Sequence, residues 1–192
     1  MSEMHGSYLP LFEKIDSMLQ RENVIFAIDG GSGSGKTTLA NLLQSTYDCN
    51  VFHMDDFFLQ PHQRTKERLE EAGGNVDRER FLEEVLLPLK RNEDVFLRRF
   101  DCSSLTIMPE VVIQPKKLTV IEGSYSMHPT LSDYYDFGVF LDIDPKLQKE
   151  RIIKRNLPEF AARFFEMWIP MEEKYHRAFK IKEQCELIFS IK

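Results

Sequence analysis

One short run of residues limits what this 192-residue chain can fold into more than any other. It fits the pattern G-x-x-x-x-G-K-[ST] and reads Gly30-Gly31-Ser32-Gly33-Ser34-Gly35-Lys36-Thr37. An apolar run from Val24 to Ile28 precedes it, and a helical pattern with Leu39, Leu42 and Leu43 follows. The glycines let the backbone curl around phosphate oxygens, and the helix presents its positive end to the same anion. The sequence therefore predicts a phosphate-binding loop between a strand and a helix.

The end of this loop predicts how a nucleoside triphosphate is held. We expect Lys36 to reach the β- and γ-phosphates as a catalytic cation, and the hydroxyl of Thr37 to bind Mg²⁺. The alternative is a flexible glycine linker. A linker does not explain why the run ends in Lys-Thr-Thr, with Thr38 as its last residue, and enters an apolar helix.

Composition limits the class of protein. Hydrophobic residues make up 42% of the chain, and 192 residues leave little room for a second core, so we expect a single domain over residues 1–192. The formal net charge of −6 gives no global positive field, so we expect neither nucleic acid nor a membrane as partner. The three cysteines lie far apart, without a C-x-x-C pair, as is typical of reduced thiols in a cytoplasmic protein.

Apolar runs alternate with helical patterns along the chain. The predicted strands are Val24 to Ile28, Asn50 to His53, Leu118 to Ile121, Phe137 to Ile143 and Leu187 to Ile191. The predicted helices are Tyr8 to Leu19, Lys36 to Tyr47, Asp77 to Leu87, Pro145 to Arg155 and Ala161 to Lys182. Short continuous apolar strands are typical of a parallel sheet with helices on both faces, which predicts a doubly wound α/β fold. Residues 94–114 break the alternation and predict an inserted antiparallel hairpin.

Two acids follow the second predicted strand. Asp55 and Asp56 come just after His53, at the carboxyl edge of the sheet, where ligands of open α/β folds bind. A carboxylate there can take the proton of a substrate hydroxyl that attacks a γ-phosphoryl group, or can orient Mg²⁺ through water. We interpret Asp55 as the base and Asp56 as the second candidate, both in contact with substrate. The alternative for Asp56 is a cap of the following turn.

A third acid follows the strand that ends at Ile121. Glu122 stands where enzymes with this phosphate-binding loop keep the carboxylate that holds the water shell of the metal. An acid at a strand end can also merely cap a turn. Gly123 beside it indicates a close backbone approach to a ligand. We therefore expect Glu122 to be a magnesium-supporting residue.

Several segments together are much more specific than the loop alone. They are Gly30 to Thr38, Asp55 to Phe58, Asn75 to Asp77, Ile121 to Gly123, and Asp142 to Asp144 leading to Arg151 and Arg155. In order and spacing the chain resembles the uridine kinase-like family of P-loop kinases, which includes nicotinamide riboside kinase and phosphoribulokinase. Asp-Asp-Phe-Phe looks especially like nicotinamide riboside kinase. The resemblance implies a P-loop NTPase fold with a five-stranded parallel sheet, helices on both faces, a small lid and a hairpin insertion.

The same resemblance implies an activity and roles for residues. ATP with Mg²⁺ would phosphorylate a hydroxyl of a small molecule, a nucleoside such as uridine or a nucleoside-like riboside. Asp55 would be the base and Glu122 would support the magnesium. Asp77 matches the acid that binds the ribose hydroxyls, although alone it looks like a helix N-cap. Arg151 and Arg155 match a catalytic lid over the phosphates, where arginine stabilises developing charge, and a solvated helix face is the alternative.

Other side chains are candidates without a motif of their own. Arg163 lies just beyond the lid arginines, where it would bind the nucleotide on closure. Tyr125 follows Glu122, and Arg99 lies on the hairpin, so both are candidates for substrate contact, with a solvent-facing edge the alternative for Arg99. His128 is interpreted as a surface residue. The helically spaced aromatics Phe164, Phe165, Trp168 and Tyr175 are interpreted as core or as a stripe facing a partner, which leaves a homo-oligomer open.

Other functions remain as alternatives. The acceptor of a P-loop kinase could instead be pantothenate, glycerate or a sugar phosphate, because the lid departs from that of uridine kinases and carries no information on the base. A P-loop ATPase without a small acceptor is the second alternative. A regulatory GTPase is not favoured, because no Asn-Lys-x-Asp or Thr-Lys-x-Asp motif follows the loop.

Overall fold

A five-stranded parallel sheet forms the centre of the computed structural model, which describes residues 8–21 and 23–192. The first seven residues of the expected single domain and Glu22 lie outside the described residues. The strand order is β2-β7-β1-β8-β9. The strands are β1 (Val24–Gly30), β2 (Cys49–His53), β7 (Leu118–Glu122), β8 (Phe137–Ile143) and β9 (Leu187–Ile191). Each coincides with a predicted strand, so the α/β fold with a parallel sheet is confirmed.

Helices cover both faces of this sheet, because successive side chains of β1 point to opposite sides. Val24, Phe26 and Ile28 pack into one hydrophobic cluster, together with residues of α2 and α3. Ile25 and Ala27 pack into the other, which holds residues of α5, α6, α7 and α10. The bounds are α2 (Leu9–Met18), α3 (Lys36–Thr46), α5 (Arg78–Phe81), α6 (Leu87–Lys90), α7 (Pro129–Ser132) and α10 (Ile169–Phe179).

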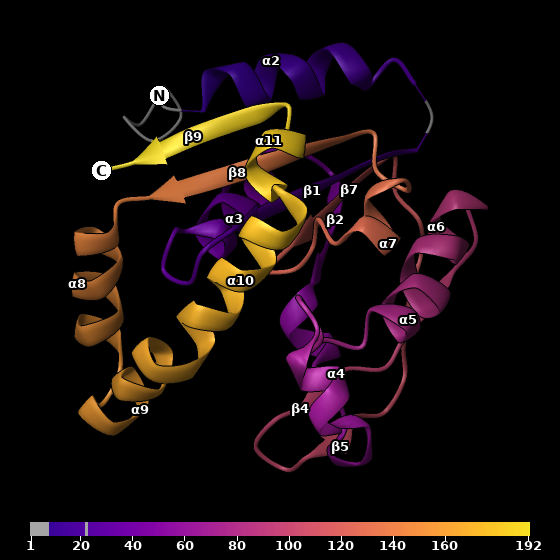
Figure 1. The fold of residues 1–192 in the computed structure, drawn as a ribbon. Helices are drawn as coiled ribbons and strands as arrows, with labels where there is room; N and C mark the ends of the chain where they lie inside the picture. Colours follow the sequence, from indigo (N-terminus) through magenta and orange to yellow (C-terminus); the bar gives the residue numbers. More distant parts are fainter. Residues whose placement is uncertain (1–7, 22) are drawn as a thin grey trace.

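The predicted helix from Ala161 to Lys182 is broken into several pieces. They are α9 (Pro158–Arg163), a π-helical turn η4 (Phe164–Trp168), α10 and α11 (Ile181–Gln184), which follow α8 (Pro145–Arg155). Lys180 separates α10 from α11 with a left-handed backbone, φ 50°. Figure 1 shows α8 and α9 leading into α10, which runs across the sheet towards α11. The prediction of a single uninterrupted helix from Ala161 to Lys182 is therefore wrong, because the helical path is interrupted at Lys180.

The predicted helix from Asp77 to Leu87 is also interrupted. A π-helical turn η3 (Leu82–Leu86) joins α5 to α6, and the helical path continues to Lys90. Asp77 lies before the first turn as its N-cap. Among the described residues, no helix has both the length and the apolar character needed to cross a lipid bilayer.

The inserted hairpin is present in two short steps. Strand β3 (Val95–Leu97) pairs antiparallel with β6 (Val111–Ile113), and β4 (Phe100–Asp101) pairs antiparallel with β5 (Thr106–Ile107). Three short helical elements follow β2, namely η1 (Met54–Phe57), η2 (Pro61–Gln63) and α4 (Lys66–Glu70). In Figure 1 the β4–β5 step lies beside α4, at the end of the molecule opposite α2.

Candidate functional site

A cavity of about 1060 Å³ lies at the carboxyl ends of the central strands. Its walls include the loop from Ser32 to Thr38, Asp55 after β2, residues 122–125 after β7, and side chains from α8, η4 and α10. These segments are far apart in sequence, but β2, β7 and β1 are neighbours in the sheet, so their ends meet at one edge. The cavity is therefore where parallel α/β folds bind their ligands.

The phosphate-binding loop has the expected shape. Gly33 and Gly35 have φ angles of 80° and 101°, a backbone region that residues other than glycine rarely adopt. The Lys36 ammonium turns back onto the loop, where it donates to the carbonyl of Gly30 at 2.8 Å and to that of Gly31 at 3.1 Å. It also donates to the hydroxyl of Ser124 at 3.3 Å. The loop is thus closed around its own lysine.

A hydroxyl and a carboxylate meet beside the loop. The Thr37 hydroxyl donates to Oε1 of Glu122 at 3.1 Å, and the same oxygen lies 2.5 Å from Nδ1 of His53. The hydrogen bond to Glu122 raises the pKa of His53 above its ordinary value, although burial opposes this. The described residues contain no group of three or more His, Cys, Asp or Glu side chains suited to a metal. Mg²⁺ commonly takes one or two protein oxygens and completes its shell with phosphates and water, so Thr37 and Glu122 fit it.

The two acids after β2 have different surroundings. Met54 and Phe57 are buried and fix the turn η1, and between them Asp55 lines the cavity, whereas Asp56 does not. Asp55 is exposed to solvent at the cavity, but desolvation by the surrounding protein raises its pKa above the ordinary value, opposed by the Lys36 ammonium and assisted by Glu122. Burial also raises the pKa of Asp56, opposed by His53. Of the two, Asp55 has the access to ligands that a base requires.

Gly123 has a structural reason to be glycine in addition to the one that the sequence indicates. Its φ is 141°, and a Cβ atom added there would lie 2.7 Å from Cβ of Met54. The start of η1 therefore requires glycine at this position by its close approach, and Gly123 also lines the cavity, where a ligand could approach its backbone. Through this contact the ends of β2 and β7 pack tightly, which fixes Asp55 relative to Glu122.

Helix α8 holds its arginines against the cavity. Asp144 caps the helix by accepting from the N–H groups of Lys146 and Leu147. Arg151 Nη1 donates to the carbonyl of Gly33 at 2.9 Å, and the Arg155 guanidinium lies 5.3 Å from the ring centroid of Phe164. Both arginines line the cavity.

Arg163 and Arg99 do not reach this cavity. Arg163 is an exposed residue on α9, and Arg99 is exposed on the hairpin between β3 and β4. Neither contributes to the cavity wall. Arg99 is close enough to Asp56 to oppose the rise in the pKa of that acid that burial causes.

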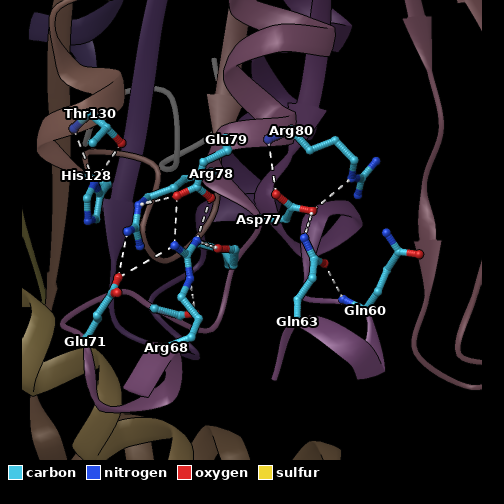
Figure 2. Close-up of polar contacts among 12 residues, drawn as sticks. Gln60, Gln63, Arg68, Glu71, Asp77, Arg78, Glu79, Arg80, His128 and Thr130 are labelled. Carbon is cyan, nitrogen blue, oxygen red and sulfur yellow. Dashed lines mark hydrogen bonds and ion pairs between the residues drawn. The ribbon is translucent and has the colours of Figure 1, made fainter. Parts of the chain in front are cut away.

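Asp77 is a buried N-cap, as its local sequence indicates. Its Oδ1 accepts from the backbone N–H of Arg80 at 3.1 Å, and its Oδ2 accepts from Gln63 Nε2 at 2.8 Å. Figure 2 shows these contacts beside the ion pairs of Arg68 with Glu79 and of Arg78 with Glu71. Asp77 does not line the cavity, so its carboxylate serves the helix in this state.

Tyr125 lines the cavity, but several residues of the cavity wall were not predicted from the sequence to be site residues. They are Phe58, Asn75, Cys102, Ser124, Lys154, Phe160, Phe164, Trp168 and Glu172. Of the predicted aromatic stripe, Tyr175 is core, whereas Phe164 and Trp168 face the cavity. Glu172 had one available signal: it lies three residues before Tyr175 and so on the buried face of an amphipathic helix. A carboxylate on such a face needs polar partners.

The sequence of this chain is similar to those of known proteins. A family model described as "Phosphoribulokinase / Uridine kinase family" matches residues 25–160. The uridine kinase of Staphylococcus epidermidis is 29% identical over 149 residues, which cover 72% of this chain and 70% of that protein. The uridine kinase of Staphylococcus haemolyticus is 30% identical over 146 residues, which cover 70% and 69%.

The fold has a solved counterpart as well. A structure described as "a Possible Uridine Kinase from Bacillus stearothermophilus" matches with a TM-score of 0.75 and 23% identity, and the match covers 98% of this chain and 100% of that one. It supports the architecture only. The family model spans the loop, the acids after β2 and β7, and all of α8. The chain therefore belongs to the phosphoribulokinase/uridine kinase family of P-loop kinases.

Proposed function

We propose that this protein is a single-domain, ATP-dependent kinase that transfers the γ-phosphoryl group to a hydroxyl of a nucleoside-like small molecule, a nucleoside such as uridine or a related riboside. The observation that carries the proposal is Asp55. It lines the same cavity as the phosphate-binding loop and Lys36, and desolvation raises its pKa. An acid with a raised pKa beside a triphosphate site suits a general base for an attacking hydroxyl.

Each step of the transfer has a residue in reach. Asp55 accepts the proton of the acceptor hydroxyl as the hydroxyl oxygen attacks the γ-phosphorus, and the bond from that phosphorus to the β,γ-bridging oxygen breaks so that ADP leaves. Lys36 leaves the loop carbonyls and donates to the phosphate oxygens. Arg151 and Arg155 line the same cavity from α8, where they stabilise the charge on the transferred phosphoryl group and on the leaving ADP. Mg²⁺, held by Thr37 and Glu122, would neutralise charge on the phosphates when bound.

The nature of the acceptor rests on the relatives. The name uridine kinase describes an enzyme that phosphorylates the nucleoside uridine. This chain is 29% to 30% identical to two proteins of that name. Phe58, Asn75 and Tyr125 line the same cavity as the proposed base, Asp55. An aromatic ring together with amide and hydroxyl groups suits a riboside, which has one apolar face and several polar edges.

The proposal is tested by coupled ADP release with Mg²⁺, ATP and a panel of acceptors: uridine, cytidine, nicotinamide riboside, pantothenate and glycerate. We expect turnover that depends on a riboside. Release of ADP at the same rate with every acceptor, or with none, would show an ATPase instead. Turnover only with pantothenate or glycerate would keep the kinase and replace its acceptor.

The base is tested by substitution. Asp55→Asn preserves the shape but cannot accept the proton, so we expect acceptor phosphorylation to fall about 10²- to 10⁴-fold while nucleotide binding is nearly unchanged. Asp56→Asn is the matched comparison, because Asp56 is adjacent but does not line the cavity, and we expect the smaller loss. Full turnover in Asp55→Asn would refute the mechanism.

A further inference from the structure

Glu172 places a carboxylate directly on the phosphate-binding loop. It belongs to α10, it is 5% exposed, and it lines the cavity. Its Oε2 accepts from the backbone N–H of Ser32 at 2.8 Å, and its Oε1 accepts from the Ser32 hydroxyl at 2.6 Å. A residue 140 positions away in sequence therefore fixes both the backbone and the side chain of Ser32.

The same carboxylate is connected to the loop lysine. The Ser124 hydroxyl lies 2.8 Å from Oε1 of Glu172, and the Lys36 ammonium donates to Ser124 Oγ at 3.3 Å. A hydroxyl has one proton. When Ser124 donates it to Glu172, its lone pairs face Lys36. The three side chains then form one chain of hydrogen bonds, in which Glu172 sets the direction.

Helix α10 is itself firmly held where Glu172 leaves it. The Tyr175 hydroxyl donates to Oδ2 of the fully buried Asp29 at 2.8 Å, and His176 Nε2 lies 3.4 Å from Oδ1. Asp29 is on β1, immediately before the loop. Glu172 is thus one helical turn from an anchor, and its position relative to the loop is well defined.

A negative charge is not what a phosphate site requires for binding. The cavity is built to hold an anion, and a carboxylate on its wall repels a triphosphate. A purely structural link between α10 and the loop could use an uncharged side chain. The charge is better explained by its effect on the donors that it orients, because hydrogen bonds to a carboxylate are short and directional.

We propose that Glu172 is a positioning residue for phosphoryl transfer, which acts through Ser124 on Lys36 and through Ser32 on the phosphate-binding loop. This role rests on the proposed kinase function. Glu172 does not touch the reacting atoms. It keeps the lysine and the loop preorganised for the transition state. Its negative charge at the same time weakens the binding of the nucleotide in the ground state.

The test separates turnover from binding. Glu172→Gln keeps the size of the side chain but leaves one accepting oxygen for three donors. We expect kcat to fall about 10- to 100-fold, the range found when a group that orients an active-site ligand is removed. The KM and Kd for ATP should stay the same or decrease, because a repelling charge is gone. The chain has one tryptophan, Trp168, and it lines the cavity, so its fluorescence follows nucleotide binding without any acceptor.

The control is the neighbouring residue. Glu173 is on the same helix, but its side chain is 63% exposed and it pairs only loosely with Arg177, at 3.9 Å. Glu173→Gln should leave kcat and Kd within about twofold of the wild type. Unchanged kcat in folded Glu172→Gln would overturn the proposal. So would parallel loss of kcat, nucleotide binding and thermal stability, which indicates a structural role.

A second variant keeps the proposal testable if Glu172→Gln does not fold. Ser124→Ala breaks the path to Lys36 but leaves Glu172 bonded to Ser32, and it should lower kcat without raising Kd. In the double variant the loss should be less than the product of the single losses, because both act on one path. Fully multiplicative losses would exclude the path through Ser124. A wild-type protein that transfers phosphate to no acceptor would instead refute the proposed function, and with it this role.

Discussion

The imidazole of His128 caps a short helix from inside the protein. Its Nδ1 accepts from the backbone N–H of Thr130 at 3.2 Å, and its ring stacks on Tyr175 with centroids 6.2 Å apart. Figure 2 shows the contact with Thr130. The residue is 5% exposed, which corrects its interpretation as a surface histidine. Burial lowers the pKa of His128 to about 4, and the nearby Arg78 contributes.

This depressed pKa makes stability depend on pH. Below about pH 6.5 the unfolded chain binds a proton at His128 that the folded protein does not, so the stabilisation is complete above pH 6.5 and is lost as the pH falls towards 4. The expected loss is up to about 3 kcal/mol. Urea unfolding at pH 7, 6 and 5 measures it. His128→Asn retains a capping side chain without a titrating ring, so its stability should fall less over the same range, and parallel curves would contradict the assignment.

The sequence predicted the role of a residue near the site only where that role depends on neighbours in the sequence. Asp55 follows β2 by two residues and Glu122 is the last residue of β7, and both line the cavity. His128 and Asp77 have partners that local sequence only partly reveals. The cap formed by Asp77 depends on residues 78–80, but its bond to Gln63 depends on how the chain folds back.

At the level of elements, prolines explain where two helices widen. The π-helical turn η3 ends at Leu86, two residues before Pro88, and η4 ends at Trp168, two residues before Pro170. A proline ring clashes with the carbonyl four residues earlier, and it has no N–H to donate. In both helices that carbonyl falls within the wide turn. The helix therefore continues past the proline, which the spacing of apolar residues alone does not predict.

Asp144 caps α8, and we expect a single substitution there to lower the stability of the protein measurably. Asp144 satisfies two N–H groups at the start of the helix that carries Arg151 and Arg155. Asp144→Ala should lower the free energy of unfolding by about 1 kcal/mol, whereas Asp144→Asn, which still accepts a hydrogen bond, should lower it much less. Chemical denaturation of both variants measures the difference. Equal losses would mean that the charge, not the cap, is what matters.

At the scale of the whole molecule, the sheet order assembles the site. β1 lies between β7 and β8, and β2 pairs with β7, so the loop, Glu122 and Asp55 come to one edge. Folding and nucleotide binding are therefore coupled, because the cavity exists only when all these strands are paired. A ligand that binds only the folded state stabilises it by mass action.

That coupling gives a measurable shift. Mg-ADP at about 100 times its Kd should raise the free energy of unfolding by about 2.7 kcal/mol. Lys36→Met removes the ammonium that we propose donates to the phosphates, so the shift at the same ADP concentration should be much smaller. Lys66→Met is the control, since that side chain is 82% exposed on α4 and its ion partner at 3.8 Å is Glu70. An equal shift in Lys36→Met would show that the nucleotide binds elsewhere.

The sequence by itself determined the strands, the phosphate-binding loop and the acids at the strand ends, because each depends on neighbours within a few residues. Only the tertiary structure decided which of Asp55 and Asp56 faces the cavity, that Arg163 and Arg99 do not reach it, and that Glu172 meets Ser32. These outcomes depend on how η1, α9, α10 and the hairpin are placed relative to the ends of the sheet strands. The helical spacing can place Glu172 on a buried face, but hydrogen bonds between residues more than a hundred positions apart leave no periodic or local signal, so the sequence pattern does not identify their partners.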